Sequence, residues 1–233
     1  MLKVSSLTKK YGKVTAVENL SFEVNGGEVC AIMGPNGAGK STTIKCICGL
    51  LRYGGSVTIG GYSLNNKEAR RLFGYVPETP AVFELLTIRE HIDFIASAYG
   101  IKDYEAEMNE LFQRFDLEDK LDKVGKELSK GMQQKLSICC AAIIRPKLLL
   151  LDEPMVGLDP KAIKELKKLI LELKETGCAV LISTHIIDSI NGLWDRVLIM
   201  KNASVLRDIK REEMENAGKT LEEMFFEVTG VDE

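Results

Sequence analysis

The chain has 233 residues, 45% of them hydrophobic, and a formal net charge of −3 at pH 7. A chain of this length can bury a core, and it fits one large domain or one domain that carries a subdomain. The small net charge gives no electrostatic reason to expect a nucleic acid partner. No apolar run approaches the ~18 residues that a membrane-spanning helix needs, and the N-terminus lacks the apolar core of a signal peptide. We therefore expect a soluble intracellular protein.

Six cysteines could in principle form a set of disulfides. Most of them lie inside apolar stretches, and none shows C-x-x-C spacing, so buried and reduced packing residues are the better interpretation than disulfides, zinc ligands or redox centres. They are Cys30, Cys46, Cys48, Cys139, Cys140 and Cys178.

The first third of the chain predicts short strands joined by tight turns. Residues 2–7 and 20–24 alternate between apolar and polar types, and Asn25-Gly26-Gly27 is a turn signal that leads into the apolar run 29–33. Further short strands are expected at residues 56–59 and 73–76. This region should therefore be rich in hairpins, with one strand-loop-helix unit set into it.

Residues 34–41 fit the phosphate-binding pattern G-x-x-x-x-G-K-[ST] at every fixed position. The run 29–33 predicts a buried strand before the loop, and residues 41–51 predict the helix after it. Glycines let backbone N–H groups turn toward phosphate oxygens, and the helix N-terminus adds its positive end. Lys40 supplies a cation for the terminal phosphates and Ser41 a hydroxyl for Mg²⁺. The expected nucleotide-binding residues are Gly34, Pro35, Asn36, Gly37, Ala38, Gly39, Lys40, Ser41 and Thr42.

The pattern becomes helical between residues 85 and 145. Thr87-Ile88-Arg89-Glu90 is a capping box, and apolar residues then recur at helical spacing. Because strand-containing regions lie on both sides, we expect residues 85–145 to form an inserted helical subdomain. Residues 1–84 and 146–233 would form the core with its β subdomain. Such an insert often moves relative to its host.

Residues 128–135 begin a further helix in this insert. Ser129 at the N-cap and Gly131 in the first turn would present a hydroxyl and bare N–H groups, which makes a second anion site. One chain cannot easily direct both anion sites at a single nucleotide, because this one belongs to the insert. Two chains packed head to tail can.

An aliphatic run, residues 148–151, ends in Asp152 and Glu153. Its composition predicts a strand that is buried on both faces, as in a parallel sheet. Asp152 at the strand end can hold Mg²⁺, while Glu153 points elsewhere and can polarise the attacking water. The alternative, a loop with two acidic residues, is disfavoured by the turn at residues 157–160 that follows.

The last part of the chain alternates helix and strand. Pro160 suits the first turn of a helix that ends near Gly177, residues 179–183 predict a buried strand, and residues 196–200 with 204–208 resemble a hairpin. Thr220 begins a last short helix. The helix that starts at Pro160 carries several lysines that lie mostly off its apolar face. We expect them to form a solvated surface: Lys161, Lys164, Lys167, Lys168 and Lys174.

Taken together, these motifs resemble the ATP-binding subunits of ABC transporters over essentially the whole chain. Residues 34–41 look like the Walker A loop, 129–133 like the signature sequence, 148–153 like Walker B, 157–159 like the D-loop and 183–185 like the switch histidine. The resemblance implies an α/β fold with a P-loop NTPase core, an antiparallel β subdomain and an inserted helical subdomain. It also implies ATP and Mg²⁺ as cofactors, with ATP held between one subunit's Walker A loop and the other subunit's signature helix. Asp159 is then expected near the nucleotide.

Two further site residues depend on the resemblance. Tyr11 lies where the family keeps an aromatic residue that stacks on adenine, although a tyrosine before a glycine is by itself more often a turn or core residue. A lone histidine would usually be a structural hydrogen-bonding group. We expect His185 to contact the terminal phosphate and to orient Glu153, because it directly follows a strand that should end beside that phosphate.

The chain departs from the family pattern in two motifs. Glu78 takes the place of the usual glutamine in the loop before the insert, where it could still ligate Mg²⁺ but adds negative charge. In the signature, Lys130 replaces the first glycine and Met132 the usual glutamine, while Ser129 and Gly131 remain. These variants resemble the branch that serves exporters of the multidrug, sodium, haem or peptide-resistance kind.

We therefore predict an ATPase that works as a homodimer or paired ATPase subunit, bound through an integral membrane permease to the cytoplasmic face of the membrane, without nucleic acid. Val82, Phe83 and Leu86 are candidates for the permease contact, or else for packing inside the insert. The alternative is a soluble ABC-type ATPase that acts on the ribosome or on DNA, which is disfavoured because only one domain is present. A kinase or GTPase is disfavoured because residues 66–69, Asn-Lys-Glu-Ala, do not supply the guanine-reading pattern N-K-x-D.

Overall fold

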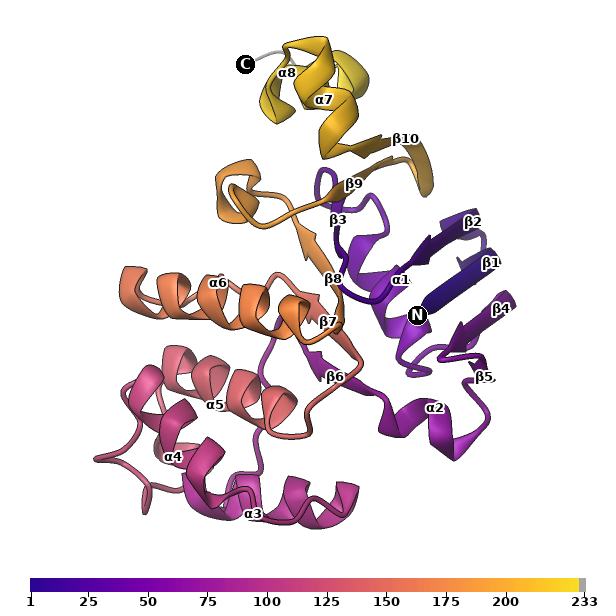
Figure 1. Ribbon diagram of the computed structural model, residues 1–233. Helices are drawn as coiled ribbons and strands as arrows, with labels where there is room; N and C mark the ends of the chain where they lie inside the picture. The colour runs from indigo at the N-terminus through magenta and orange to yellow at the C-terminus, as the bar shows by residue number, and fades with distance from the viewer. Residues whose placement is uncertain (231–233) are drawn as a thin grey trace.

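A computed structural model describes residues 1–230 as two β-sheets with helices between and around them (Figure 1). The expected core was drawn to residue 233, so its last three residues, 231–233, lie outside the described part. The smaller sheet is antiparallel, with the order β2-β1-β4-β5. Its strands are β1 (Leu2–Tyr11), β2 (Val14–Val24), β4 (Gly54–Ile59) and β5 (Tyr62–Ser63).

The larger sheet has six strands in the order β10-β9-β3-β8-β7-β6. Its inner pairs are parallel, and only the edge pair of β9 and β10 is antiparallel. Its strands are β3 (Val29–Met33), β6 (Phe73–Val76), β7 (Leu148–Asp152), β8 (Ala179–Thr184), β9 (Arg196–Lys201) and β10 (Ser204–Lys210).

Helices cover both faces of the larger sheet (Figure 1). They are α1 (Lys40–Ile47), α2 (Lys67–Arg71), α3 (Ile88–Tyr99), α4 (Glu105–Arg114), α5 (Lys130–Ala142), α6 (Pro160–Glu175), α7 (Arg211–Ala217) and α8 (Leu221–Thr229), with 3-10 turns η1 (Gly125–Glu127) and η2 (Ile187–Ile190). Within residues 1–230, none of these helices has both the length and the apolar composition that crossing a bilayer requires.

Alternate residues of the central strands enter two different cores. In β3, Cys30 and Ile32 pack with α1 and the antiparallel sheet, whereas Ala31 and Met33 pack with the helices on the other face. β7 divides its leucines in the same way. This is the packing that all-apolar strands require, because successive side chains of a strand point to opposite faces. The aliphatic runs therefore lie in the middle of the molecule, and their carboxyl ends meet at one edge of the sheet.

The insert is helical, and its first helix begins as the sequence indicated. Thr87 Oγ1 accepts a hydrogen bond from the backbone N–H of Glu90, and Glu90 Oε2 accepts one from the N–H of Thr87, which completes the capping box. Buried side chains of α3 and α4, among them Ile92, Met108 and Phe112, belong to the same core as α5. α3, α4 and α5 lie together at the lower left of Figure 1.

Three local expectations need correction. The helix after the phosphate loop is shorter than residues 41–51, because Gly49 has φ of +74° and α1 ends at Ile47. The first strands are longer than expected, since β1 and β2 form one hairpin that turns at Gly12, with φ of +58°. The short helices α2 and α7 were not expected, because neither shows a sustained apolar periodicity.

Candidate nucleotide-binding site

The loop between β3 and α1 places the start of α1 at the carboxyl edge of the larger sheet. β3 is buried between its parallel neighbours β8 and β9, which fixes the position of the loop. Gly39 caps α1 with φ of +106°, and a Cβ atom there would lie 2.3 Å from the carbonyl oxygen of Ala16. No side chain caps α1, and its first turn has no acidic residue. The N-terminal N–H groups of α1 thus remain available to an anion.

Lys40 is the buried cation of this loop, with 5% of its surface exposed. Its ammonium donates hydrogen bonds to the carbonyl oxygens of Gly34 at 2.8 Å and Pro35 at 3.3 Å, and lies 3.8 Å from Glu153 Oε1. Burial lowers the pKa of Lys40, an effect that the carboxylates of Glu153, Asp152 and Glu78 oppose. The ammonium is thus held at the loop by carbonyl groups and faces three carboxylates.

Asp152 is fully buried at the carboxyl end of β7. Its Oδ1 accepts hydrogen bonds from Ser41 at 2.8 Å and Ser183 at 2.5 Å. Its Oδ2 has no hydrogen-bond partner within the described residues. A buried carboxylate oxygen without a partner is costly unless a cation satisfies it, and a carboxylate beside a serine hydroxyl is a donor set that suits Mg²⁺. The residues present therefore fit a magnesium ion.

Glu153 follows Asp152 with φ of +47°, a left-handed conformation that turns its side chain out of the strand. Its N–H donates to the carbonyl and to Oγ of Ser183, at 3.1 and 3.2 Å, which fixes this turn. Its Oε1 lies 2.8 Å from His185 Nδ1. The structure thus brings Glu153 into contact with the histidine that was expected to orient it.

A cavity of about 350 Å³ lies between these groups. It is lined by Ala16, Asn36, Gly37, Ala38, Gly39, Lys40, Ser41, Thr42, Glu78, Glu153, Val156 and His185. Most of the sequence-predicted site residues therefore surround one space. Tyr11 does not line it: this residue lies at the end of β1, half exposed, with the Lys9 ammonium 4.8 Å from its ring centre.

The second predicted anion site lies elsewhere in the same chain. Ser129 caps α5, where its Oγ accepts a hydrogen bond from the N–H of Met132 at 3.3 Å. Gly131 packs against the turn after β7, since a Cβ atom there would lie 2.9 Å from the carbonyl oxygen of Gly157. Neither Ser129 nor Gly131 lines the cavity at Lys40.

Asp159 is engaged within its own chain. Its Oδ1 caps α6 by accepting from the N–H of Ala162 at 2.9 Å, and its Oδ2 lies 2.8 Å from the ammonium of Lys135 on α5. The hydrogen bond from Lys135 lowers the pKa of Asp159, and the N–H of Ala162 acts in the same direction. Asp159 therefore joins α5 to the start of α6 and does not reach the cavity.

Sequence reasoning missed several residues that hold the site in place. Ser183 contacts both Asp152 and Glu153, and Gln134, also buried, donates to the carbonyl oxygen of Pro154 at 3.1 Å. Ser183 could have been found from the strand pattern, because parallel strands that end together place it beside Asp152 in the register. No signal in the sequence indicated Gln134 or Lys135.

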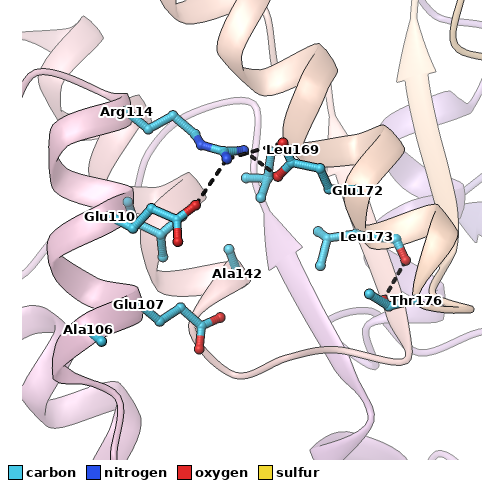
Figure 2. Close-up of a pocket in the computed structure, with 10 residues that line it drawn as sticks. Ala106, Glu107, Glu110, Arg114, Ala142, Leu169, Glu172, Leu173 and Thr176 are labelled. Atoms are coloured by element: carbon cyan, nitrogen blue, oxygen red, sulfur yellow. Dashed lines mark hydrogen bonds and ion pairs between the residues drawn. The ribbon is translucent and has the colours of Figure 1, made fainter.

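A separate cavity of about 400 Å³ lies between α4, α5 and α6 (Figure 2). At its rim, Arg114 of α4 donates to both carboxylate oxygens of Glu172 on α6, at 2.7 and 3.2 Å, and to Glu110 at 3.2 Å. None of the predicted site residues lines this cavity. Its walls come from α4 and α5, which belong to the expected insert, and from α6 of the expected core.

The strand-loop-helix unit with its lysine, and the paired carboxylates at the adjacent strand end, define the class of this protein as a P-loop NTPase. Comparison with known proteins then gives the family. The family model described as "ABC transporter" matches residues 17–156, more than half of the chain. The chain belongs to the ABC transporter family, and it is an ATP hydrolase of the ABC type.

Individual relatives agree with this assignment. The ABC-type transporter ATP-binding protein EcsA of Bacillus subtilis is 36% identical over 242 residues, covering 100% of this chain and 98% of EcsA. The SkfA peptide export ATP-binding protein SkfE of the same organism is 32% identical, covering 90% of this chain and 89% of SkfE. Among solved structures, a dimeric post-hydrolysis state of the ATP-binding cassette MJ0796 with ADP and Pi is similar, with a TM-score of 0.81 and 28% identity over 90% of this chain and 98% of that one.

Proposed function

We propose that this chain is the ATPase subunit of an export system, in which two such subunits close on ATP and reopen on hydrolysis beside an integral membrane permease. One observation carries the proposal. Lys40, Glu153 and His185 line one cavity, whereas Ser129 and Gly131, the residues of the proposed second anion site, do not line it. Each chain therefore offers two half-sites, and a head-to-tail pair of chains would complete both. The likeness to the dimeric MJ0796 cassette supports this arrangement.

In the proposed site, the loop from Gly34 to Thr42 binds the phosphates through its N–H groups and through Lys40. Ser41 and Asp152 would hold Mg²⁺, whose charge neutralises the terminal phosphates. Glu78 faces the same cavity.

Glu153 would accept the proton of the attacking water, because its carboxylate lies inside the cavity. His185 would orient this carboxylate through the 2.8 Å contact to Nδ1, and its exposed edge would contact the terminal phosphate. Tyr11 would stack on adenine from outside the cavity, at the end of the β1–β2 hairpin. Asp159 would act near the nucleotide through the partner subunit.

The permease contact would lie on the insert and the loop before it. Large apolar side chains are exposed there, at 52% for Phe83, 76% for Leu85 and 50% for Phe94. Phe83 and Phe94 pack edge to face with ring centres 5.2 Å apart, so they form one apolar patch. Of the residues expected from the sequence, Val82 and Leu86 are half-buried and would support this patch.

A buried histidine holds the patch in place. His91 Nε2 accepts from the N–H of Phe83 at 2.9 Å, and Nδ1 lies 2.6 Å from the carbonyl oxygen of Thr87. The ring therefore carries its proton on Nδ1 in this arrangement. His91 joins the loop that bears Phe83 to the first turn of α3.

Export is favoured by the likeness to SkfE, whose name gives peptide export. Association with the membrane would then be through the permease. Co-purification of the chain with a membrane protein, lost on replacing Phe83 and Leu85 by serine, would support this part. Retention of the same partner by the double variant would count against the patch.

The two-chain site is tested by Ser129→Arg. This change places a bulky cation on the face that would meet the partner's ATP, so we expect hydrolysis to fall at least about 100-fold. ATP affinity of the single chain should stay within about twofold, because Ser129 does not line the cavity at Lys40. Fluorescent-nucleotide binding and phosphate release measure the two quantities. If both fell together, Ser129 would act within its own chain and the proposal would fail.

A further inference from the structure

Two charged residues lie beside the groups of the proposed two-chain site: Glu78 lines the cavity at Lys40, and Lys130 follows Ser129 at the start of α5. One adds a negative charge and the other a positive charge. What we infer for these two residues rests on the proposed two-chain arrangement.

Glu78 adds a third carboxylate to a cavity with one lysine. Glu153 is paired with His185 and lies 3.8 Å from Lys40, and Asp152 accepts from two hydroxyl groups. Glu78 faces Lys40 across the cavity but forms no ion pair or side-chain hydrogen bond with the rest of residues 1–230. Of the three carboxylates, that of Glu78 is the exposed one, and it has no close partner within residues 1–230.

Lys130 is the corresponding charged residue of the other half-site. It is the first residue of α5 and is exposed, and the Cδ atom of its side chain lies 4.0 Å from the position that a Cβ atom on Gly157 would take. Of the nearby lysines, Lys135 lies 2.8 Å from Asp159 and Lys161 lies 2.6 Å from Asp116, whereas Lys126 forms no ion pair within residues 1–230. Lys130 makes no ion pair within the part of the chain that the structure describes.

We propose that Lys130 of one subunit and Glu78 of the other form a charge pair across the bound nucleotide, so that Lys130 supports closure of the two subunits by offsetting the negative charge of Glu78. In the proposed arrangement, the signature helix of one chain covers the cavity of the other. Closure brings charged groups together while water leaves, and this strengthens both attraction and repulsion. A third carboxylate beside the phosphates would oppose closure, and a lysine brought by the partner would reduce that opposition.

A double-mutant cycle tests the pair. All variants carry Glu153→Gln, so that ATP is bound but not consumed, and the dissociation constant of the dimer is measured by sedimentation with Mg²⁺ and ATP. Lys130→Met keeps the aliphatic stem beside Gly157 but removes the charge. We expect it to weaken the dimer about tenfold when residue 78 is Glu, and by no more than about twofold when Glu78→Gln is present. Lys130→Arg should retain the affinity.

Two controls separate this effect from others. Lys147→Met removes an exposed lysine at the opposite end of β7 and should leave the dimer unchanged. ATP affinity of the single chain should stay unchanged in every Lys130 variant, because that lysine would act only on the partner's site. Circular dichroism checks folding, and Lys130→Gln replaces Lys130→Met if that variant does not fold.

Equal weakening of the dimer in both backgrounds, or weakening in neither, overturns the pairing of Lys130 with Glu78 while leaving the proposed function intact. If the Glu153→Gln protein does not dimerise with ATP at any concentration, the two-chain site itself is wrong, and the pairing falls with it.

Discussion

Two groups of charged side chains lie in different parts of the molecule, one around Lys40 at the carboxyl edge of the larger sheet and one around Arg114 between α4 and α6. Around Arg114 each charge has a partner: the guanidinium contacts Glu172 through both oxygens and Glu110 through a third hydrogen bond (Figure 2). Around Lys40 three carboxylates face one ammonium, and Asp152 Oδ2 has no partner within residues 1–230.

The difference separates charges that hold the fold together from charges that are left for a substrate. An ion pair that is complete within the protein stabilises a contact between elements. A buried carboxylate oxygen without a partner costs stability and is retained where a ligand satisfies it. Changes at the two groups should therefore affect different quantities, which the next three predictions test; a fourth prediction concerns the ion pair of Asp159 with Lys135.

The largest effect is expected for Glu153→Gln. An amide cannot accept the proton of water, so we expect the rate of ATP hydrolysis to fall by about 10²–10⁴-fold. ATP binding should persist, because the glutamine keeps the size of the side chain and can still contact His185. Single-turnover phosphate release and nucleotide binding measure these quantities. Glu172→Gln, at the Arg114 group, is the matched control and should hydrolyse ATP normally; wild-type hydrolysis by Glu153→Gln would falsify the role of Glu153.

A smaller effect is expected for Ser183→Ala. The change removes one hydrogen bond to Asp152 Oδ1 and one acceptor for the N–H of Glu153. Because partners of a metal ligand tune its affinity, the Mg²⁺ concentration that gives half-maximal hydrolysis should rise about tenfold. Thr176→Ala removes a hydroxyl at the far end of α6 and serves as the control. An unchanged Mg²⁺ requirement would show that Ser183 is only a packing residue.

Arg114→Ala should change stability. The Arg114 side chain is 13% exposed and joins the insert to the core, so its loss should lower the free energy of unfolding by about 1 kcal/mol. Arg145, whose side chain is 56% exposed, pairs with Glu107 at 2.7 Å. Arg145→Ala should cost less than about 0.5 kcal/mol. Urea denaturation measures the free energy of unfolding of the two variants. Equal losses would show that the Arg114 group stabilises the fold no more than an exposed ion pair does.

The smallest effect is a pH dependence at the start of α6. Lys135 and the N–H of Ala162 lower the pKa of Asp159 in the folded chain. Stability from this group is therefore fully present above the pKa of an unfolded Asp, about 3.9, and is lost as the pH falls through the lower folded value. The protection factor of the Ala162 amide, its exchange relative to the intrinsic rate at each pH, should hold at pH 4 and fall below it. The same pH profile in Asp159→Asn would contradict this origin.

Much of this site could be anticipated from the sequence because its residues are consecutive or end neighbouring strands. The phosphate loop at residues 34–41 and the carboxylates after β7 follow from local patterns, and the all-apolar runs indicated a buried parallel sheet. Glu153 and His185 were expected to meet, and the structure places them 2.8 Å apart. Their chemical roles stay predictions.

Contacts between distant segments could not be anticipated in the same way. The pair of Lys135 with Asp159, and the bond from Gln134 to Pro154, depend on how α5 packs against the turn after β7. Two exposed apolar residues of the proposed permease patch, Leu85 and Phe94, were also missed. Leu85 lies in the loop before α3, where periodicity defines no face, and Phe94 is a large apolar residue on the exposed side of α3, where periodicity predicts polar residues.

The ammonium of Lys40 already donates hydrogen bonds to the carbonyl oxygens of Gly34 and Pro35, and a ligand that binds this ammonium would have to replace them. A phosphate oxygen has to compete with two backbone carbonyls for the same ammonium, so binding there is an exchange of partners. A ligand whose charge ends at the first phosphate leaves those bonds intact and gains little from the lysine. A triphosphate can replace them with stronger, charge-assisted bonds. At the proposed site, this exchange of partners would favour ATP over AMP before any second subunit arrives.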